Sequence, residues 1–501
     1  MSSANSSTPP SATPAGLTDN DARRALGAFY TPTHVVDHMV SLLRRLDSAS
    51  LLLEPSGGDG AFVSRLLAKK LLTPAQIEVW DLDPACKEPI EDLGVAFTEK
   101  DALLDPPPLA RYTHVIGNPP YLNKQSAYIK ANRAQLKSLF SPIGANDTYA
   151  MFIYQALVSL RPAGQLVFII SDTFMTLGIH RRLRELLLSS TTIDSITLLP
   201  KDTFKDAAVN TAILSLRNSP APAKHSISFF DLRNAPAGDY SSTPTARITQ
   251  TDFTKVPSMV FTFEPHRRLA LDVSSKCSPL LDLLDGGLGM YTKDNSQFLA
   301  RVDYQDPPPA TLRPGYISYT AVDAHAWRFY HKRGGHQKWY TPAEHAVRFD
   351  PASRADYGMP RTALAGLDSK AKPRPGFIVS GVSATLSART ITPGAMWESN
   401  KAFGFFPKDP VAYPPEFFIA ILNSTWYAEL ARSLNHTVSL QIRDLKALPL
   451  LPFTAKERHT LVTLARQAIS NVKAAKDPVA QQVAIDAIVT RVAQRVTMAT
   501  K

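Results

Sequence analysis

The sequence predicts an α/β protein whose N-terminal part is a doubly wound, mostly parallel sheet and whose C-terminal part is a smaller α+β domain. From Leu51 to Arg217, short apolar runs rich in β-formers alternate with longer amphipathic segments, as in a parallel sheet covered by helices. A glycine turn joins the first apolar run to such a segment. After about Asn218, proline becomes frequent and the alternation irregular, which indicates a second domain.

The expected elements follow from these runs in chain order. The predicted strands are Leu51–Glu54, Ile77–Asp81, His114–Ile116, Gln165–Ile170, Ser195–Leu198 and Ala212–Leu216. The amphipathic segments predict helices over Thr33–Arg45, Ala61–Lys70, Asp147–Leu160 and His180–Leu188. Ligands of such a sheet lie beyond the carboxyl ends of its strands, so we expect the functional site there.

At 501 residues the chain is too long for one ordinary hydrophobic core, and its composition indicates how it is divided into domains. Residues 1–22 are rich in Ser, Thr, Pro and Ala and predict a disordered tail. We expect the first domain at 23–220, a connecting segment at 221–277 and the second domain at 278–455. Residues 456–501 carry Ala, Val, Arg and Gln at helical spacing and predict C-terminal helices.

Charge and cysteine content narrow the class of protein. A net charge of +11 favours a polyanionic partner. Two cysteines, Cys86 and Cys277, exclude a disulfide framework and a multi-cysteine metal site, which fits a reducing cytoplasm, and we expect no bound metal. The longest strongly apolar run, Leu166–Ile170, is too short to cross a bilayer, so we expect no membrane association.

Acidic side chains follow the predicted strands. The first strand ends in Glu54-Pro55-Ser56-Gly57-Gly58-Asp59-Gly60, a turn that lets backbone approach a ligand, although such turns also serve helix packing. Asp81 follows about twenty residues later, where an acid can accept both ribose hydroxyls. Glu54 and Asp59 suit a ligand that carries ammonium and sulfonium groups, and S-adenosylmethionine is such a ligand. Asp101 could accept from its adenine amino group.

The tetrapeptide Asn118-Pro119-Pro120-Tyr121 follows the apolar run that ends at Gly117. An exocyclic aromatic amine is a poor nucleophile because its lone pair is delocalised into the ring, so acceptors must pull on its hydrogens. The Asn118 side-chain oxygen and the Pro119 carbonyl could do this, and Tyr121 offers a flat face to a base. A proline-rich turn after a strand is the alternative interpretation.

These segments together resemble the gamma-class, Taq-type DNA adenine-N6 methyltransferases of restriction–modification systems, which have a Rossmann-like catalytic domain. The matching segments are Gly27-Ala28-Phe29-Tyr30-Thr31-Pro32, Glu54 to Phe62, Asp81-Leu82-Asp83-Pro84, Asp101, and Asn118 to Tyr121. In Asp81 the chain departs from its relatives, which more often carry glutamate there.

The resemblance implies roles around the cofactor. Tyr30, Thr31 and Pro32 would cover its methionine end, and Glu54 would lie near its ammonium group. Asp81 would bind the ribose, Asp101 the adenine amine, and the Phe152 ring would pack on the adenine. Further cofactor residues by the same resemblance are Ser56, Gly57, Gly58, Gly60, Leu82, Ala102 and Pro120.

The resemblance also implies a flipped-out adenine as the methyl acceptor. Tyr121 would stack on this base, and Phe204, within Leu199–Thr211, would be a second stacking aromatic. A core residue before the last predicted strand is the alternative for Phe204. No general base is required, because methylation itself makes the nitrogen acidic and its proton leaves to solvent.

Four phrases of the second domain resemble the C-terminal target-recognition domains of this class. They are Gly287–Asn295, Phe377–Ser383, Leu422-Asn423-Ser424 and Ile442–Pro449. The segment Trp327–Tyr340 interleaves basic and aromatic side chains, which suits contact with phosphates, although a solvated hairpin explains the composition equally well. We expect four DNA contacts in it: Arg328, Lys332, Arg333 and Lys338.

The expected partners are therefore double-stranded DNA and, by the resemblance, a separate restriction endonuclease, in the cytoplasm of a bacterium or archaeon. Two other interpretations stay open. The tetrapeptide also occurs in enzymes that methylate release-factor glutamine or ribosomal RNA, and a DNA specificity subunit without catalysis belongs to a different class. The target sequence and the choice between monomer and dimer are open as well.

Overall fold

The computed structural model describes residues 30–105, 108–204, 210–322, 326–332, 337–368, 372–383, 385–399, 401–434 and 440–498. The expected tail, Gly27 to Phe29 and Arg333 lie outside these ranges. The chain forms two compact units, the first ending at Thr254 and the second beginning at Lys255. Each unit has its own sheets and helices.

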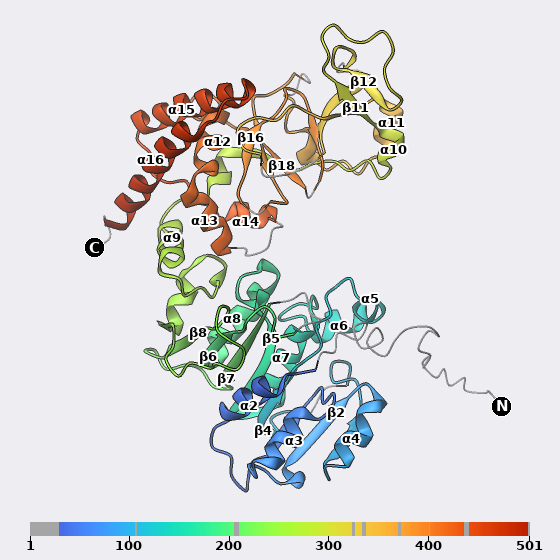
Figure 1. The fold of residues 1–501 in the computed structure, drawn as a ribbon, viewed down its shortest axis with the longest axis vertical. Coiled ribbons are helices and arrows are strands. Elements are labelled where there is room, and N and C mark those ends of the chain that lie inside the picture. Colours follow the sequence, from blue (N-terminus) through green and yellow to red (C-terminus); the bar gives the residue numbers. More distant parts are fainter. Residues whose placement is uncertain are drawn as a thin grey trace, which may run out of the picture. The chain divides into compact units, whose positions relative to one another are not determined.

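The first unit is built on a nine-stranded sheet with the order β3-β2-β1-β4-β5-β7-β6-β8-β9 (Figure 1). Strands β3, β2, β1, β4 and β5 are parallel, whereas β7 runs antiparallel to β5 and β6. This largely parallel sheet confirms the α/β class. The strands are β1 (Leu52–Glu54), β2 (Ile77–Asp81), β3 (Ala96–Glu99), β4 (Tyr112–Gly117), β5 (Leu160–Ser171), β6 (Thr192–Leu198), β7 (Thr211–Arg217), β8 (Ser226–Asp231) and β9 (Ala246–Thr249).

The helices of this unit confirm the four that the sequence predicts and add three short ones. They are α2 (Thr33–Ser41), α3 (Ala61–Ala68), α4 (Lys87–Glu91), α5 (Ala127–Ala131), α6 (Arg133–Leu139), α7 (Thr148–Ser159) and α8 (Arg181–Ser190). Helix α2 ends earlier than expected because the backbone of Arg44 bonds to the sheet instead: its N–H donates to Gln165 Oε1 at 2.9 Å, and its carbonyl contacts His114 Nε2 at 2.8 Å.

Two parts of this sheet were not predicted as strands. Strand β3 is an edge strand whose residues are mostly exposed, so it lacks the apolar run that marks a buried strand. Strand β8 pairs with β6, and β9 pairs with β8. Both lie inside the expected connecting segment 221–277, so the sheet continues past residue 220, where we expected the first domain to end.

The second unit combines two sheets with helices, which confirms its α+β composition. One sheet has the order β10-β18-β15-β16 and the other β12-β11-β14-β13-β17. The strands are β10 (Leu284–Leu288), β11 (Leu299–Asp303), β12 (Tyr316–Ser318), β13 (Trp327–His331), β14 (His345–Arg348), β15 (Phe377–Ser380), β16 (Ala388–Thr390), β17 (Met396–Trp397) and β18 (Ala402–Pro407). The helices are α9 (Pro265–Ser275), α10 (Asn295–Phe298), α11 (Pro351–Ala355), α12 (Pro415–Asn423), α13 (Thr425–Leu434), α14 (Ile442–Lys446), α15 (Ala455–Lys473) and α16 (Val479–Met498).

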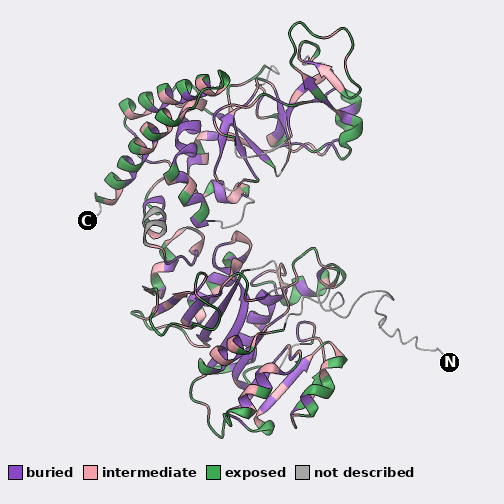
Figure 2. Ribbon diagram, in the orientation of Figure 1, coloured by how far each residue is buried: buried purple, intermediate pink, exposed green. Residues whose placement is uncertain are grey.

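The C-terminal helices α15 and α16 confirm the helical prediction for the end of the chain. They are not a separate appendage, because Leu461 and Val489 belong to the same buried cluster as Phe377 and Phe403 of the four-stranded sheet. In Figure 2 the strands of this sheet are drawn largely in purple, the colour of buried residues. Thr454 starts α15 with a capping box, since its hydroxyl accepts from Glu457 N and the Glu457 carboxylate accepts from Thr454 N.

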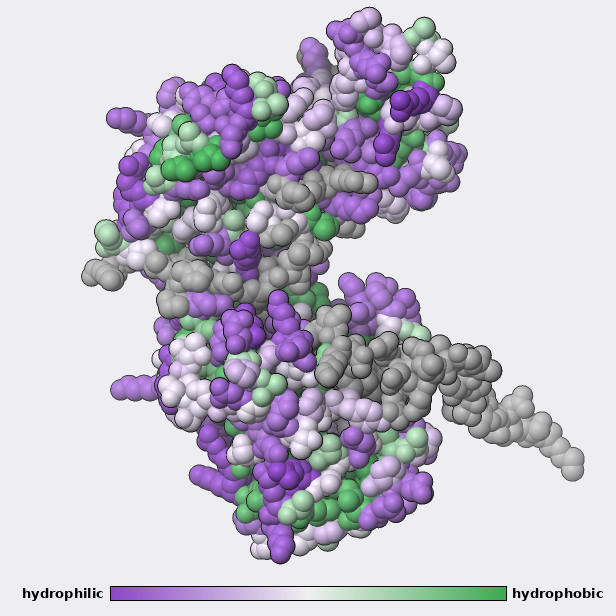
Figure 3. Space-filling model, in the orientation of Figure 1, coloured by the Kyte–Doolittle hydropathy of each residue, from purple (hydrophilic) through white to green (hydrophobic). Residues whose placement is uncertain are grey.

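Among the described helices, none is long and apolar enough to cross a membrane. The face drawn in Figure 3 is mostly hydrophilic, with smaller hydrophobic areas between the hydrophilic ones. Exposed large hydrophobic side chains include Val479 and Val483, one turn apart on α16.

Asn423 at the end of α12 completes the edge of the four-stranded sheet. Its side chain accepts from Ala388 N and donates to Ala388 O, both at 2.8 Å, as a neighbouring strand would. Its own carbonyl accepts from Lys338 Nζ at 2.8 Å. Because Asn423 is fully buried, no water replaces these bonds when the side chain is removed.

We predict that Asn423→Ala lowers the free energy of unfolding by about 1–3 kcal/mol, because the buried N–H of Ala388 loses its partner, whereas the Ala388 carbonyl keeps its bond from Trp339 N. Urea unfolding followed by circular dichroism measures this. The exposed Asn234→Ala serves as the control and should change the same free energy by less than about 0.5 kcal/mol. An equally small change for Asn423→Ala would contradict the strand-mimic role.

Candidate active site

The first unit contains a cavity of about 270 Å³, close to the lower end of roughly 300–1,000 Å³ for small-molecule sites. Its lining includes most of the residues that the sequence places around a cofactor. These are Tyr30, Thr31, Glu54, Ser56, Gly57, Gly58, Asp81, Leu82, Asp101, Ala102, Pro120 and Phe152, together with Asn118. Five expected site residues are not part of the lining: Pro32, Gly60, Pro119, Tyr121 and Phe204.

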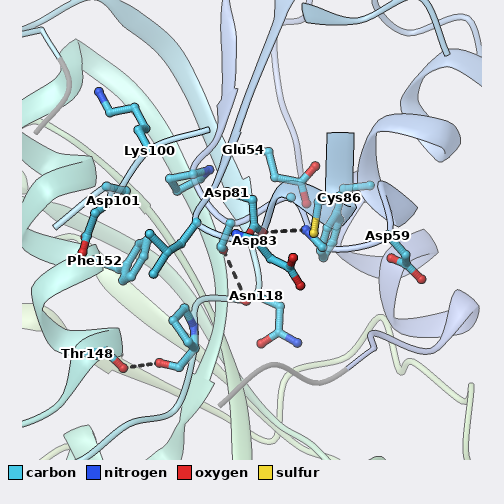
Figure 4. A pocket seen from close by; sticks show the side chains of 18 of the residues that line it. Glu54, Asp59, Asp81, Asp83, Cys86, Lys100, Asp101, Asn118, Thr148 and Phe152 are labelled. Atoms are coloured by element: carbon cyan, nitrogen blue, oxygen red, sulfur yellow. Dashed lines mark hydrogen bonds between the residues drawn. The ribbon is translucent and has the colours of Figure 1, made fainter. Parts of the chain in front are cut away.

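The strand order explains why these residues meet. Glu54 ends β1, Asp81 ends β2, and Asn118 directly follows β4, and these three strands are parallel neighbours. Carboxyl ends of adjacent parallel strands lie at one edge of a sheet. Figure 4 shows the labelled acids and Asn118 gathered around the same pocket.

The glycine turn after β1 needs its glycines for space and for backbone conformation. A Cβ on Gly57 would lie 2.3 Å from the Val79 side chain, so β2 leaves no room for a larger residue. Gly60 has a φ of 72° and precedes α3, a left-handed conformation that other residues rarely adopt. The turn is also tied to β2, since Gly57 N donates to Trp80 O at 3.0 Å and Gly58 N donates to Asp81 Oδ2 at 2.9 Å.

The cavity is strongly acidic. Among its described lining residues, the carboxylates of Glu54, Asp59, Asp81, Asp83 and Asp101 face one basic side chain, Lys100. Glu54 is only 1% exposed, and burial together with Asp59 and Asp81 raises the pKa of its carboxyl group well above the ordinary value. Its Oε2 is buried and has no hydrogen-bond partner among the described residues. A buried carboxylate of this kind fits a cationic group of a ligand.

Asp81 is held in place by backbone. Its Oδ2 accepts from Gly58 N, and its Oδ1 accepts from Asp83 N at 2.9 Å. Burial raises the pKa of Asp81, although these backbone bonds oppose the shift. Each carboxylate oxygen can accept a second hydrogen bond, so the fixed group suits a pair of hydroxyls.

Tyr128 of α5 is a lining residue that the sequence did not reveal. Its hydroxyl donates to Asp101 Oδ2 at 2.8 Å, while Leu103 N donates to Asp101 Oδ1 at 2.9 Å. Burial and the Asp101 carboxylate raise the pKa of Tyr128, which keeps the hydroxyl protonated. Other lining residues that we did not predict as site residues include Lys100, Leu122 and Thr148.

Hydrogen bonds hold the loop of Asn118 to Tyr121 from two sides. Asn118 Nδ2 donates to Thr31 Oγ1 at 3.1 Å, and the Tyr121 hydroxyl donates to Asn118 Oδ1 at 2.8 Å. Thr148, the buried first residue of α7, donates to Pro120 O through its hydroxyl and accepts from Leu122 N at 2.9 Å. The position of the Asn118 amide is therefore set by its neighbours before any ligand binds.

Phe204 does not lie where the sequence places it. It is 6% exposed and packs in the hydrophobic cluster of the first unit, with Leu199 and Ile213, rather than against the cavity. The core interpretation is therefore the one that the structure supports. An aromatic residue between two buried strands gains more from burial than it would at a solvated edge.

The expected DNA contacts of the second unit also need correction. Arg328 is 8% exposed, lies over the Phe349 ring and donates from Nη1 to Gly394 O at 3.1 Å. Lys338 donates to Asn423 O, and burial lowers its pKa. Both side chains thus stabilise their own unit, and surface contact with DNA was the wrong prediction for them. Lys332 is partly exposed and stays a prediction, and Arg333 lies outside the described residues.

Part of the chain is similar in sequence to known methyltransferases. Residues 82–204 match the model of the Eco57I restriction-modification methylase family. The type II methyltransferase M.HincII of Haemophilus influenzae is 26% identical over 183 residues, which cover 36% of this chain and 34% of that protein. The modification methylase CviBIII of Paramecium bursaria Chlorella virus NC1A is 25% identical over 204 residues, 40% of this chain and 52% of that protein. The matches thus span about a third to a half of these relatives.

Among solved structures, the DrdV protein in a complex with DNA has the same fold over 90% of this chain and 58% of its own, with a TM-score of 0.54 and 14% identity. Asn118, Asp83 and Asp101 lie within the matched region 82–204, whereas Glu54, Asp59 and Asp81 precede it. Residues 82–204 of the chain are therefore similar to the Eco57I restriction-modification methylases.

Proposed function

We propose that this chain transfers a methyl group from S-adenosylmethionine to the N6 amine of a flipped-out adenine in double-stranded DNA, at a specific target sequence. The observation that carries this proposal is the placement of Asn118 on the same cavity as Glu54, Asp81 and Asp101. An acceptor for an amine and an acidic site for a cationic nucleoside thus share one edge of the sheet.

The residues of the cavity fit S-adenosylmethionine. Buried Glu54, whose Oε2 has no partner among the described residues, would face its ammonium group, and the backbone-held Asp81 would accept from its ribose. Asp101 would accept from the adenine amine, and Phe152 would pack on that ring. Tyr30 and Thr31 would close the methionine end. When bound, the cofactor supplies an electrophilic methyl group.

The tetrapeptide loop would activate the substrate amine. Asn118 Oδ1 and the Pro119 carbonyl each accept one N–H, which shifts electron density back to the nitrogen. The nitrogen would form its bond to the methyl carbon with that lone pair while the bond from this carbon to the sulfonium sulfur breaks and leaves a neutral thioether. The nitrogen would then carry the positive charge and lose one proton to water. No side chain is needed as a general base, since the alkylated nitrogen is a strong acid.

The adenine would have to leave the duplex to reach this loop, at a cost of a few kcal/mol. Stacking on Tyr121 would offset part of that cost, by about 1–3 kcal/mol. Tyr121 does not line the cofactor cavity, and the proposal places the base against its ring outside that cavity.

The second unit would be the target-recognition domain. The likeness in fold to DrdV in its complex with DNA covers 90% of this chain and so includes most of that unit, and the net charge of +11 suits a polyanion. We further propose that the protein acts in the cytoplasm of a bacterium or archaeon, and that its methylation protects DNA from a separate endonuclease.

We predict that Asn118→Ala lowers the turnover number at least about 100-fold, the effect of losing one preorganised polar group at a reacting centre. The cofactor dissociation constant should change little, since Asn118 is the amine acceptor. Transfer of labelled methyl groups to DNA measures turnover, and calorimetry measures cofactor binding. Asn123→Ala, on the exposed part of the same loop, is the matched control. Full turnover by Asn118→Ala would contradict the proposal.

We predict that Glu54→Gln weakens binding of S-adenosylmethionine by at least about tenfold, because a buried ionic partner is lost. The exposed Glu185→Gln should leave the same dissociation constant unchanged. An unaltered affinity in Glu54→Gln would rule out the assigned contact.

The same variant should be more stable than the wild type without cofactor at neutral pH. Because the pKa of Glu54 is raised in the folded protein, this protein keeps a proton at pH values where the unfolded chain has released it. The stability of the wild type therefore falls as the pH rises from the ordinary pKa of glutamate toward the pKa of Glu54 in the folded protein. The melting temperature of Glu54→Gln should therefore exceed that of the wild type by a smaller margin as the pH falls to the ordinary pKa of glutamate. A difference that does not vary with pH would contradict this cause.

A further inference from the structure

The side chain of Asn118 has two ends of nearly equal shape, and only one of them can serve an amine. Its oxygen accepts hydrogen bonds, whereas its nitrogen donates them. A half-turn of the amide would present N–H groups to the N–H groups of the substrate and remove the acceptor. The amide must therefore be held in the plane where its oxygen can reach the substrate amine.

Two hydroxyl groups contact the two ends of this amide. Thr31 Oγ1 accepts from Asn118 Nδ2 at 3.1 Å, and the Tyr121 hydroxyl donates to Asn118 Oδ1 at 2.8 Å. The Ile169 carbonyl oxygen of β5 lies 3.1 Å from the same hydroxyl, so its single hydrogen has two acceptors, of which Asn118 Oδ1 is the nearer. Burial raises the pKa of Tyr121, so this hydroxyl stays a donor at neutral pH.

We infer that Thr31 and Tyr121 form a hydroxyl clamp that holds the Asn118 carboxamide in the plane where it meets the amine of the substrate. The inference rests on the proposed function and assigns two positioning residues to it. An amide oxygen can accept two hydrogen bonds, so the bond from Tyr121 is compatible with one from an incoming amine. Each hydroxyl can donate or accept, so the clamp fixes the plane of the amide, and the N–H groups of the substrate select its oxygen end.

The clamp differs from the roles that the sequence suggests for the same residues. As a cofactor cover, Thr31 would affect cofactor affinity; as a clamp, it affects the rate at saturating cofactor and DNA. As a stacking face, Tyr121 needs only its ring; as a clamp, it needs its hydroxyl. Variants that remove only the hydroxyl group of Thr31 or Tyr121 therefore distinguish the two sets of roles.

We predict that Thr31→Val and Tyr121→Phe each lower kcat about tenfold, the effect of losing one orienting hydrogen bond, with a nearly unchanged cofactor dissociation constant. Thr31→Ser keeps the hydroxyl and should recover most of the rate. Thr33→Val makes the same exchange at an exposed position two residues away and should stay within about twofold of the wild type. Unchanged kcat in both clamp variants, or a loss confined to cofactor affinity, would overturn the inference.

A readout without turnover separates this inference from the proposed function. In protein labelled with ¹⁵N-asparagine, the side-chain amide pair of Asn118 is identified by its absence from Asn118→Asp. That pair should shift in Thr31→Val and return in Thr31→Ser. Unmoved resonances would refute the clamp, whereas a wild-type protein that methylates no DNA would refute the proposed function alone.

Discussion

The buried carboxylate of Glu54 is the constraint on which the site depends. It ends a central strand, is almost inaccessible to water and lies close to Asp59 and Asp81, whose charges further disfavour its ionised form. A carboxyl group in this position costs stability unless a ligand brings a positive charge. The glycine turn packs directly against β2, which leaves no room for a side chain at Gly57, and Gly57 and Gly58 line the cavity in which such a ligand would lie. The fold thus keeps an unfavourable acid where a cationic cofactor would relieve it.

The substrate side follows from the same sheet order. Strand β4 is the neighbour of β1, so the loop after β4 necessarily emerges next to Glu54. Two prolines stiffen this loop, and Thr148 from the start of α7 bonds it on either side of Tyr121. Rigid placement matters because an acceptor for a weakly nucleophilic amine acts only when its geometry is set in advance. The order of the strands therefore places both the acids of the cofactor site and the acceptor for the amine.

The sequence predicted this core well because its signals are local. Apolar runs locate strands β1, β2, β4, β5, β6 and β7, and a polar residue after a strand is placed by the parallel topology alone. Tyr128 had no such signal, since its contact with Asp101 depends on how a short helix folds back after the loop. Arg328 and Phe204 show the opposite failure, because basic or aromatic character does not tell a core position from a surface one. Lys338 was misread because its partner, Asn423, is distant in sequence.

The central claim is tested most directly by long-read methylation sequencing of DNA from a methylation-free bacterial host that expresses this protein, beside a host that expresses Asn118→Ala. The account predicts N6-methyladenine at one short sequence motif in the first genome and none in the second. That result would also identify the target that the second unit reads. An unmodified genome from a host with folded, cofactor-binding protein would contradict the account and would favour an RNA or protein amine as the substrate.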